Sequence, residues 1–286
     1  MTGVLVLDFD GTMTDAEAEG RPFRDGYLDD LAILVGRRAR DPDIAAIADA
    51  VEKDLAERPA ETPFLWMDRA VAPATVDPYL RMATIAHRVL DQFDKFRRAD
   101  ERGALLGGIL YKYNYAKTLE RPVFRPGAGD VLRALVGHQV YVITNSDTEA
   151  VAAKLERLET ISPGAGWLAP RVRGFARKFD LADDWTGVPP ELAVAGLARP
   201  VLLRRRTYHD IIATCLAEAG GTWEELIVVG DIFELDLALP LAMGARVGLV
   251  AGPKTPPYEL AMVNAHPRGR ALASIAEVPA FAFGSS

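Results

Sequence analysis

The sequence predicts an α/β protein, with a doubly wound parallel sheet and an inserted all-helical domain. Three observations support this fold class. Short apolar runs end in polar residues, amphipathic helical patterns lie between these runs, and one long region near the N-terminus shows helical periodicity only. Continuous apolar runs are typical of strands buried on both faces, and their alternation with helices is typical of parallel sheets.

The strands and helices of the predicted sheet domain follow one another along the chain. We expect strands at residues 3–7, 139–143, 225–229 and 246–250, with a weaker candidate at 171–174. Amphipathic patterns predict helices at residues 128–135, 148–158, 208–219 and 236–243. A second insertion, at about residues 179–199, contains Gly187, Pro189 and Pro190, is followed by Pro200, and is expected to be loop-like.

The region from about residue 25 to residue 119 interrupts this alternation. Its helical periodicity covers residues 28–35, 44–55, 78–96 and 105–119. Proline and glycine then mark the return to the sheet near residues 121–126. We therefore place the catalytic core at residues 1–20 and 121–286, and the helical domain at residues 21–120. A chain of 286 residues is long enough for this division.

The composition is ordinary for a globular protein, with 49% hydrophobic and 26% charged residues. The net charge of -7 disfavours a nucleic-acid partner, because binding to phosphate backbones depends on clustered lysine and arginine. The only dense basic patch is Arg-Arg-Arg at residues 204–206. No segment approaches the roughly 18 apolar residues of a membrane helix, and residues 4–7 are too few for a signal peptide. We therefore expect a cytoplasmic protein with no membrane partner.

Polar residues follow three of the predicted strands directly. Asp8 and Asp10 come after the first strand, Thr144 after the second, and Asp231 after a later one, with Asp236 further on, where it could also cap the next predicted helix. In open α/β sheets, ligands bind outside the carboxyl ends of the strands. We therefore expect these distant residues to share one site.

The pair Asp8 and Asp10 has three interpretations: an incidental strand-end loop, a calcium loop, or a nucleophile paired with an acid. An EF-hand loop needs glycine at its sixth position and glutamate at its twelfth, whereas Gly11 is the fourth residue counted from Asp8. Carboxylates gathered with Asp231 would repel one another unless a cation neutralised them. A hard divalent ion such as Mg²⁺ is the usual solution, and it also lets a phosphate approach a carboxylate.

Four ordered motifs of the chain resemble those of the haloacid dehalogenase (HAD) superfamily. They are Asp8-Phe9-Asp10-Gly11-Thr12-Met13-Thr14, Thr144-Asn145 after an apolar run, a basic residue further on, and Gly230-Asp231 with Asp236. The resemblance covers roughly residues 1–20 and 121–280. It implies a Rossmann-like core with a helical cap of type one, inserted after the first motif.

The resemblance also implies roles for individual residues. Asp8 would be the nucleophile that forms an aspartyl-phosphate, and Asp10 the general acid and base. Thr144 would bind the phosphoryl group. Thr12 and Asn145 are assigned to substrate binding, and Mg²⁺ to Asp8, Asp10 (through its backbone carbonyl), Asp231 and Asp236.

The basic residue of the third motif has two candidates. The superfamily pattern expects a lysine, or less often an arginine, that balances charge on the nucleophile and the phosphate. Arg206 has the expected spacing, about one helix and one strand before Asp231, whereas Lys178 has the preferred side chain. Either could instead be a solvated surface cation. Both candidates therefore stay open at this point.

The function implied by the resemblance is that of a Mg²⁺-dependent phosphohydrolase acting on a small phosphorylated metabolite. Asp10 favours phosphoester chemistry, since dehalogenase members lack a carboxylate at that position. A phosphomutase or other phosphotransferase on the same site is the first alternative, and a non-catalytic binding protein with the same fold is the second. The sequence leaves the substrate undecided, as well as the choice between monomer and homodimer.

Overall fold

The computed structural model describes residues 3–118 and 121–284, and the contacts within it divide the chain into two units. The core unit comprises Met1–Asp15, Leu65–Ala72 and Phe124–Ser286. The helical unit comprises Ala16–Phe64 and Pro73–Val123. The bounds of the two units lie a few residues from those predicted from the sequence. The predicted bound at residue 120 lies outside the described residues. The segment Leu65–Ala72 is the larger difference, since it lies inside the insertion but belongs to the core unit.

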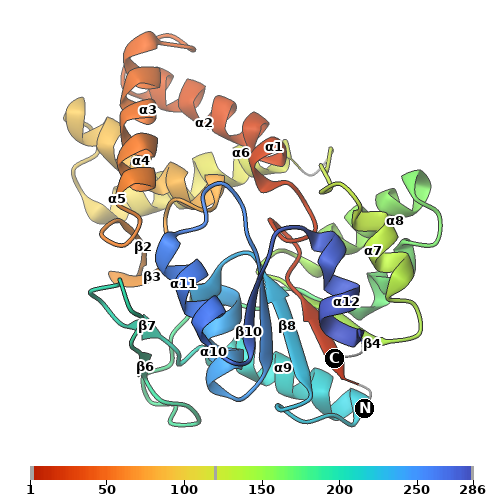
Figure 1. Ribbon diagram of the computed structural model, residues 1–286. Coiled ribbons are helices and arrows are strands. Elements are labelled where there is room, and N and C mark those ends of the chain that lie inside the picture. The colour runs from red at the N-terminus through yellow and green to blue at the C-terminus, as the bar shows by residue number, and fades with distance from the viewer. Residues whose placement is uncertain (1–2, 119–120, 285–286) are drawn as a thin grey trace. The chain divides into compact units, whose positions relative to one another are not determined.

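The core unit is built on a six-stranded sheet with the order β10-β9-β8-β1-β4-β5 (Figure 1). Every adjacent pair of these strands is parallel. β1 pairs with β4 on one side and with β8 on the other, so the chain winds outward from β1 in both directions. The topological switch point therefore lies between β1 and β8. The strands are β1 (Val4–Leu7), β4 (Gln139–Ile143), β5 (Val172–Arg173), β8 (Leu226–Gly230), β9 (Arg246–Val250) and β10 (Gly269–Leu272).

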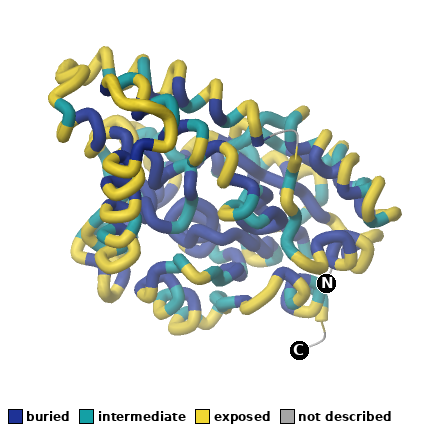
Figure 2. The backbone as a smooth tube through the Cα atoms, turned by 90° about the horizontal axis from the view of Figure 1, so that it is seen from above, coloured by how far each residue is buried: buried dark blue, intermediate teal, exposed yellow. Residues whose placement is uncertain are grey.

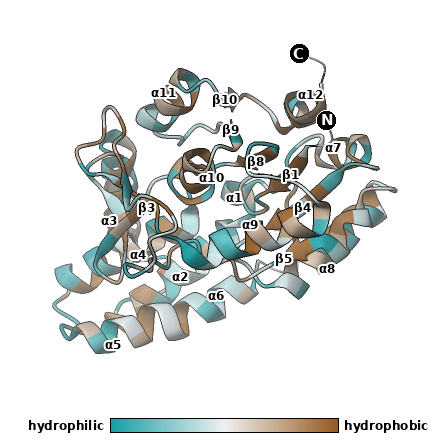
Figure 3. Ribbon diagram, turned by 90° about the horizontal axis from the view of Figure 1, so that it is seen from below, coloured by the Kyte–Doolittle hydropathy of each residue, from teal (hydrophilic) through white to brown (hydrophobic). Residues whose placement is uncertain are grey.

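Helices cover both faces of this sheet (Figure 3). On one face lie α7 (Ala128–Ala134), α8 (Thr148–Ile161) and α12 (Val278–Phe283), whose apolar side chains join those of the strands in one cluster. On the other face α9 (Arg206–Ala219) contacts β1 and β4, and α11 (Pro257–Ala265) contacts β9 and β10. The short helix α10 (Ala238–Ala242) follows β8 and contacts β9. The core unit is therefore the three-layer, doubly wound α/β fold that the sequence predicts.

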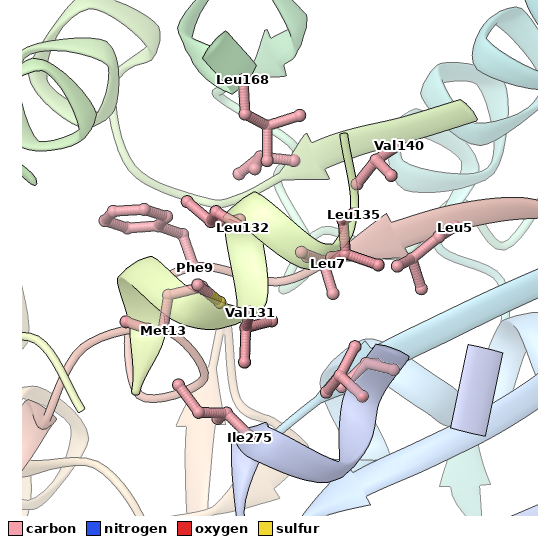
Figure 4. Close-up of a cluster of buried hydrophobic side chains, with 14 of the residues drawn as sticks. Leu5, Leu7, Phe9, Met13, Val131, Leu132, Leu135, Val140, Leu168 and Ile275 are labelled. Carbon is pink, nitrogen blue, oxygen red and sulfur yellow. The ribbon is translucent and has the colours of Figure 1, made fainter. Parts of the chain in front are cut away.

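Burial on both faces explains the apolar run of β1. All four of its residues are buried, and the buried stretches of the chain gather in the sheet (Figure 2). Leu5 and Leu7 point to the side of α7, where they meet Val131, Leu132 and Leu135 (Figure 4). The alternate residues of β1 point to the opposite face, so no polar residue is tolerated along the strand.

The helical unit has an apolar core of its own, formed by residues such as Phe23, Leu31 and Ile85. Asp41 and Asp77 cap its two long helices α3 and α4, and a proline follows each cap at the first helical position. The predicted helix end at residue 119 lies outside the described residues. The unit contains α1 (Ala16–Glu19), α2 (Arg21–Leu34), α3 (Pro42–Glu57), α4 (Pro78–Gln92), α5 (Ala99–Gly103) and α6 (Lys112–Ala116), with a π-helical stretch at Ala104–Tyr111.

The insertion is not helical throughout, because it also carries a hairpin of β2 (Pro63–Trp66) and β3 (Arg69–Pro73). Met67 and Asp68 join the strands with positive φ values of 49° and 60°. Positive φ at both central residues is typical of the tight turns that fit the twist of a hairpin. The two strands are too short to show periodicity, and the sequence pattern did not predict them.

Within residues 3–118 and 121–284, no helix combines the length and the apolar character needed to cross a lipid bilayer.

We expect Leu132→Ala in α7 to lower the free energy of unfolding by about 2–5 kcal/mol, because it removes buried methyl groups and leaves a cavity under the sheet. Urea denaturation of the purified protein measures this loss. Val136→Ala, just after α7 at a side chain 57% exposed, is the matched control and should stay within about 0.5 kcal/mol of the parent. Equal effects of the two changes would contradict the assignment of this core.

Candidate active site

Three carboxylates meet where β1 and β8 end. Asp8 directly follows β1, and Asp231 and Asp236 lie in the segment after β8. Each of the three is buried, and one oxygen from each lies within 4.8 Å of the others. The Thr12 hydroxyl lies 3.1 Å from Asp8 Oδ2 and 3.4 Å from Asp231 Oδ1, so it bridges two of them. The cluster lies at the topological switch point of the sheet.

The electrostatics of this cluster favour a bound cation. Burial raises the pKa of Asp8; the charge of Lys178 opposes this rise, and the charge of Asp236 adds to it. A metal ion would stabilise the ionised carboxylates that burial disfavours.

The donor set fits a hard divalent ion such as Mg²⁺, which binds carboxylate oxygens. All three carboxylates stay predicted ligands, since each places one oxygen in the cluster, although Asp236 also accepts from Lys178 and from the Ile232 N–H, at 2.7 and 3.1 Å. Gly11 lets the first motif approach them closely: a Cβ there would lie 2.2 Å from Asp231 Oδ2, and its φ is +85°. The backbone carbonyl of Asp10 stays a predicted ligand.

Lys178 is the cation that contacts the carboxylate cluster. Its Nζ donates to Asp8 Oδ1 and to Asp236 Oδ1, at 2.7 Å each, and its side chain is only 2% exposed. Burial alone would lower the pKa of Lys178, but the charges of Asp236 and Asp8 more than offset this effect and raise it. The ammonium group therefore stays charged and offsets part of the negative charge at Asp8, the predicted nucleophile.

The loop that carries Lys178 is hydrogen-bonded to the segment after β4. Main-chain N–H groups of residues 175 and 176 donate to main-chain carbonyls of residues 146 and 144, both at 2.9 Å. The Lys178 N–H donates to Asn145 Oδ1 at 2.7 Å. Asn145, assigned to substrate binding from the sequence, therefore holds the backbone of Lys178 in this structure.

Arg206, the other candidate cation, is not brought to the site. It is the first residue of α9, and its exposed side chain lies 3.6 Å from Asp210. Spacing along the chain favours Arg206, but the loop after β5 is hydrogen-bonded to the segment after β4 and brings Lys178 to Asp8 instead. Arg206 thus has the surface ion pair that was the alternative for either candidate.

Asp10 has partners different from those of Asp8. Its Oδ1 accepts from Lys154 Nζ at 2.9 Å, and its Oδ2 accepts from the Ser146 hydroxyl at 2.6 Å and, more weakly, from Thr144 at 3.4 Å. The predicted phosphoryl-binding hydroxyl of Thr144 thus lies beside the proposed acid–base carboxylate. Lys154 belongs to α8 and is buried.

Ser146 and Lys154 are site residues that the sequence reasoning missed. Ser146 directly precedes Asp147, the N-cap residue of α8, which accepts from the Ala150 N–H at 2.9 Å, whereas the Ser146 hydroxyl donates to Asp10. Lys154 lies on the apolar stripe of α8 between Val151 and Leu158. A lysine at a core-facing position of an amphipathic helix was the available signal.

A second buried ionic cluster lies beside the segment between Asp231 and Asp236. Glu234 accepts two hydrogen bonds from Arg199, both at 2.8 Å, and one from the Tyr258 hydroxyl at 2.6 Å. Glu259 accepts from the Glu234 N–H at 3.3 Å. Burial, and then the charge of Glu234, raise the pKa of Glu259 well above its ordinary value. The cluster ties the segment between Asp231 and Asp236 to α11.

Comparisons with solved structures identify the fold. A predicted phosphoglycolate phosphatase from Haemophilus somnus matches with a TM-score of 0.54 and 13% identity, over 96% of both chains. The haloacid dehalogenase-like protein ATU0790 of Agrobacterium tumefaciens matches at 0.53 and 16%, over 98% of this chain and 97% of its own. The HAD-hydrolase YfnB of Bacillus subtilis, bound to magnesium, matches at 0.53 and 16%, over 98% of both. The chain has the haloacid dehalogenase fold.

Sequence comparison adds no closer assignment. No protein-family model matches the chain, and no curated protein matches it in sequence. At 13–16% identity, the structural matches establish the haloacid dehalogenase fold alone. The roles of residues in this fold therefore rest on the geometry of the site.

The raised pKa of Glu259 predicts a pH-dependent stability. The folded protein holds this proton more tightly than the unfolded chain does, so stability falls as pH rises from the ordinary value of 4.5 through the folded pKa. Glu259→Gln cannot ionise and should lack this decline, which amounts to about 1.4 kcal/mol for each unit of pKa difference. Urea unfolding across a pH series measures both curves, with the exposed Glu191→Gln as control. Parallel curves for Glu259→Gln and the parent would refute the buried-acid assignment.

Proposed function

We propose that this protein is a Mg²⁺-dependent phosphohydrolase that cleaves a small phosphorylated metabolite through an aspartyl-phosphate on Asp8. One observation carries the proposal: Asp8 shares a metal-type cluster with Asp231 and a 2.7 Å contact with Lys178, while Asp10 has a separate set of partners. A nucleophile and an acid need such different surroundings to perform different tasks. The similarity to a predicted phosphoglycolate phosphatase and to a magnesium-bound hydrolase supports the proposal.

In the first step, a carboxylate oxygen of Asp8 attacks the phosphorus atom, and the bond from phosphorus to the leaving oxygen breaks. Asp10 gives its proton to that oxygen. In the second step, water attacks the phosphorus of the aspartyl-phosphate while Asp10 takes the water's proton. The bond between Asp8 and phosphorus breaks, and orthophosphate is released.

The charges around Asp8 make this attack feasible. A bound Mg²⁺ would screen the negative charges of carboxylate and phosphate and polarise the phosphoryl group. Lys178 supplies a second positive charge at Asp8 Oδ1, where it also offsets the charge of Asp236. The Thr144 and Thr12 hydroxyls lie close enough to the two aspartates to contact a phosphoryl group bound between them.

We expect Asp8→Asn to abolish Mg²⁺-dependent phosphate release from an aryl phosphate, because an amide is a poor nucleophile. The parent should release phosphate with Mg²⁺ and lose that activity on EDTA treatment. Colorimetric detection of orthophosphate and of the phenol, with matched protein concentrations, measures both.

Asp184→Asn is the control for this experiment, since Asp184 is an exposed carboxylate of the same core unit. It should retain the parent activity. Normal turnover in Asp8→Asn would sink the assignment of the nucleophile. Phosphate moving between hydroxyls of a sugar phosphate, with little net release, would instead indicate a phosphotransferase on the same site.

The choice of Lys178 over Arg206 gives a further prediction. Lys178→Met removes the charge at Asp8 and should lower kcat/KM by about 100-fold or more, a loss typical of removing an electrostatic stabiliser of the transition state. Arg206→Gln alters only an exposed ion pair and should change kcat/KM by less than about twofold. Steady-state kinetics with a saturating Mg²⁺ concentration compares them. A larger loss in Arg206→Gln than in Lys178→Met would reverse the assignment.

A further inference from the structure

The middle residue of the Arg-Arg-Arg patch is buried. Arg205 is only 1% exposed and is the N-cap residue of α9. Its guanidinium donates to three main-chain carbonyls: Nη1 to Lys178, Nη2 to Val71 at 2.9 Å, and Nε to Leu202 at 3.2 Å. Burial lowers the pKa of Arg205 to about 10, which still leaves it protonated at neutral pH. One cation thus gathers three separate backbone segments of the core unit.

The contact with Lys178 fixes the loop that delivers the site's ammonium group. Asn145 holds the main-chain N–H of Lys178, and Arg205 holds its main-chain carbonyl. Just before it, Phe175 and Arg177 have positive φ values of 52° and 46°. A left-handed backbone is unfavourable for non-glycine residues, so the loop conformation needs external support. Arg205 and Asn145 supply that support from both sides of the lysine.

An arginine at this buried position is not explained by packing alone. Taking a guanidinium out of water is unfavourable, and within the described residues its hydrogen bonds go to carbonyl groups rather than to a carboxylate. A planar fork that reaches three acceptors at once is a property of arginine that lysine lacks. The arrangement therefore favours a role in fixing the backbone geometry.

We propose that Arg205 is a positioning residue that aims Lys178 at Asp8 by clamping the lysine's main-chain carbonyl. The proposal rests on the proposed function, because the consequence of misplacing Lys178 is read out as phosphohydrolase activity. Lys178 must keep its Nζ near both Asp8 and Asp236, and a displacement of about 1 Å at a catalytic group can cost about 100-fold in rate. Arg205 itself contacts neither Asp8 nor Asp236 through a hydrogen bond shown for the described residues.

The hairpin tip, residues 65–72, contacts both Arg205 and the residues that follow Lys178. Val71 accepts from Arg205, and Trp66 packs its ring against that of Phe179 with centroids 5.8 Å apart. Trp66 Nε1 also donates to Asp180 at 2.9 Å. The residues that follow Lys178 are thus held against the tip. This explains why a short part of the insertion belongs to the core unit.

A double-mutant cycle on kcat/KM tests the proposal, using Mg²⁺ and an aryl phosphate. Arg205→Gln should lower kcat/KM by about tenfold or more in the parent background. In the Lys178→Met background, the same change should cost less than about twofold, because the group that Arg205 positions is already absent. A purely structural role for Arg205 would give the same loss in both backgrounds.

Arg204→Gln is the matched control. Arg204 is the neighbouring arginine and also donates to a main-chain carbonyl, but to that of Asp183 instead of Lys178. It should leave kcat/KM within about twofold of the parent and show no coupling to Lys178→Met. Arg205→Lys keeps the charge but cannot span three carbonyls, so it should recover only part of the activity. Arg205→Lys also serves if Arg205→Gln fails to fold, which circular dichroism and thermal unfolding show.

The outcomes separate this inference from the proposed function. Additive losses in the cycle, or parent-like activity in both Arg205 variants, overturn the role of Arg205 while the phosphohydrolase activity of the parent stands. Loss of activity in Asp8→Asn with intact Mg²⁺-dependent activity in the parent shows that the assay reports the proposed site. A parent that hydrolyses no phosphoester overturns the proposed function instead, and with it the inference that rests on it.

Discussion

The ion pair between Lys178 and the carboxylates Asp8 and Asp236 is the constraint on which the rest of the site depends. It joins segments that follow three different strands, β5, β1 and β8, at the switch point of the sheet. Buried charges of this kind are costly unless each is paired. Here Lys178 is paired with both carboxylates, and hydrogen bonds hold the paired residues in place. Asn145 and Arg205 bind the backbone of Lys178, and the Ile232 N–H donates to Asp236.

The two aspartates of the first motif are electrostatically distinct although they are two residues apart. Asp8 is buried against Lys178, whereas Asp10 is partly exposed and paired with Lys154 and Ser146. These different partners support the proposed division of roles, in which Asp8 attacks phosphorus and Asp10 transfers protons. The turn that begins at Asp10 separates them, because in a continuing strand two residues at this spacing would point to the same side.

The sequence was sufficient for the parts of the fold that repeat a pattern. Strands such as β1 and β8 are continuous apolar runs because both of their faces are buried, and that signal is local. β10 was missed, since Gly269–Leu272 lies at the sheet edge and carries an exposed arginine. The β2–β3 hairpin was missed because its stabilising contacts lie more than 100 residues away, at Phe179 and Asp180. Local periodicity carries no information about such contacts.

The same difference between local patterns and contacts distant in sequence explains which site residues could be predicted. Asp8, Asp231 and Thr144 could be placed from the sequence because each follows a recognisable strand. The cation could not, since spacing favours Arg206 and side-chain type favours Lys178, and the path of the loop after β5 decides between them. Arg205 was harder still: its partners are main-chain carbonyls, a group that every residue carries, so no pairing of residue types reveals them. A side chain that acts through the backbone leaves no motif, and its role follows only from the buried position and direction of its hydrogen bonds.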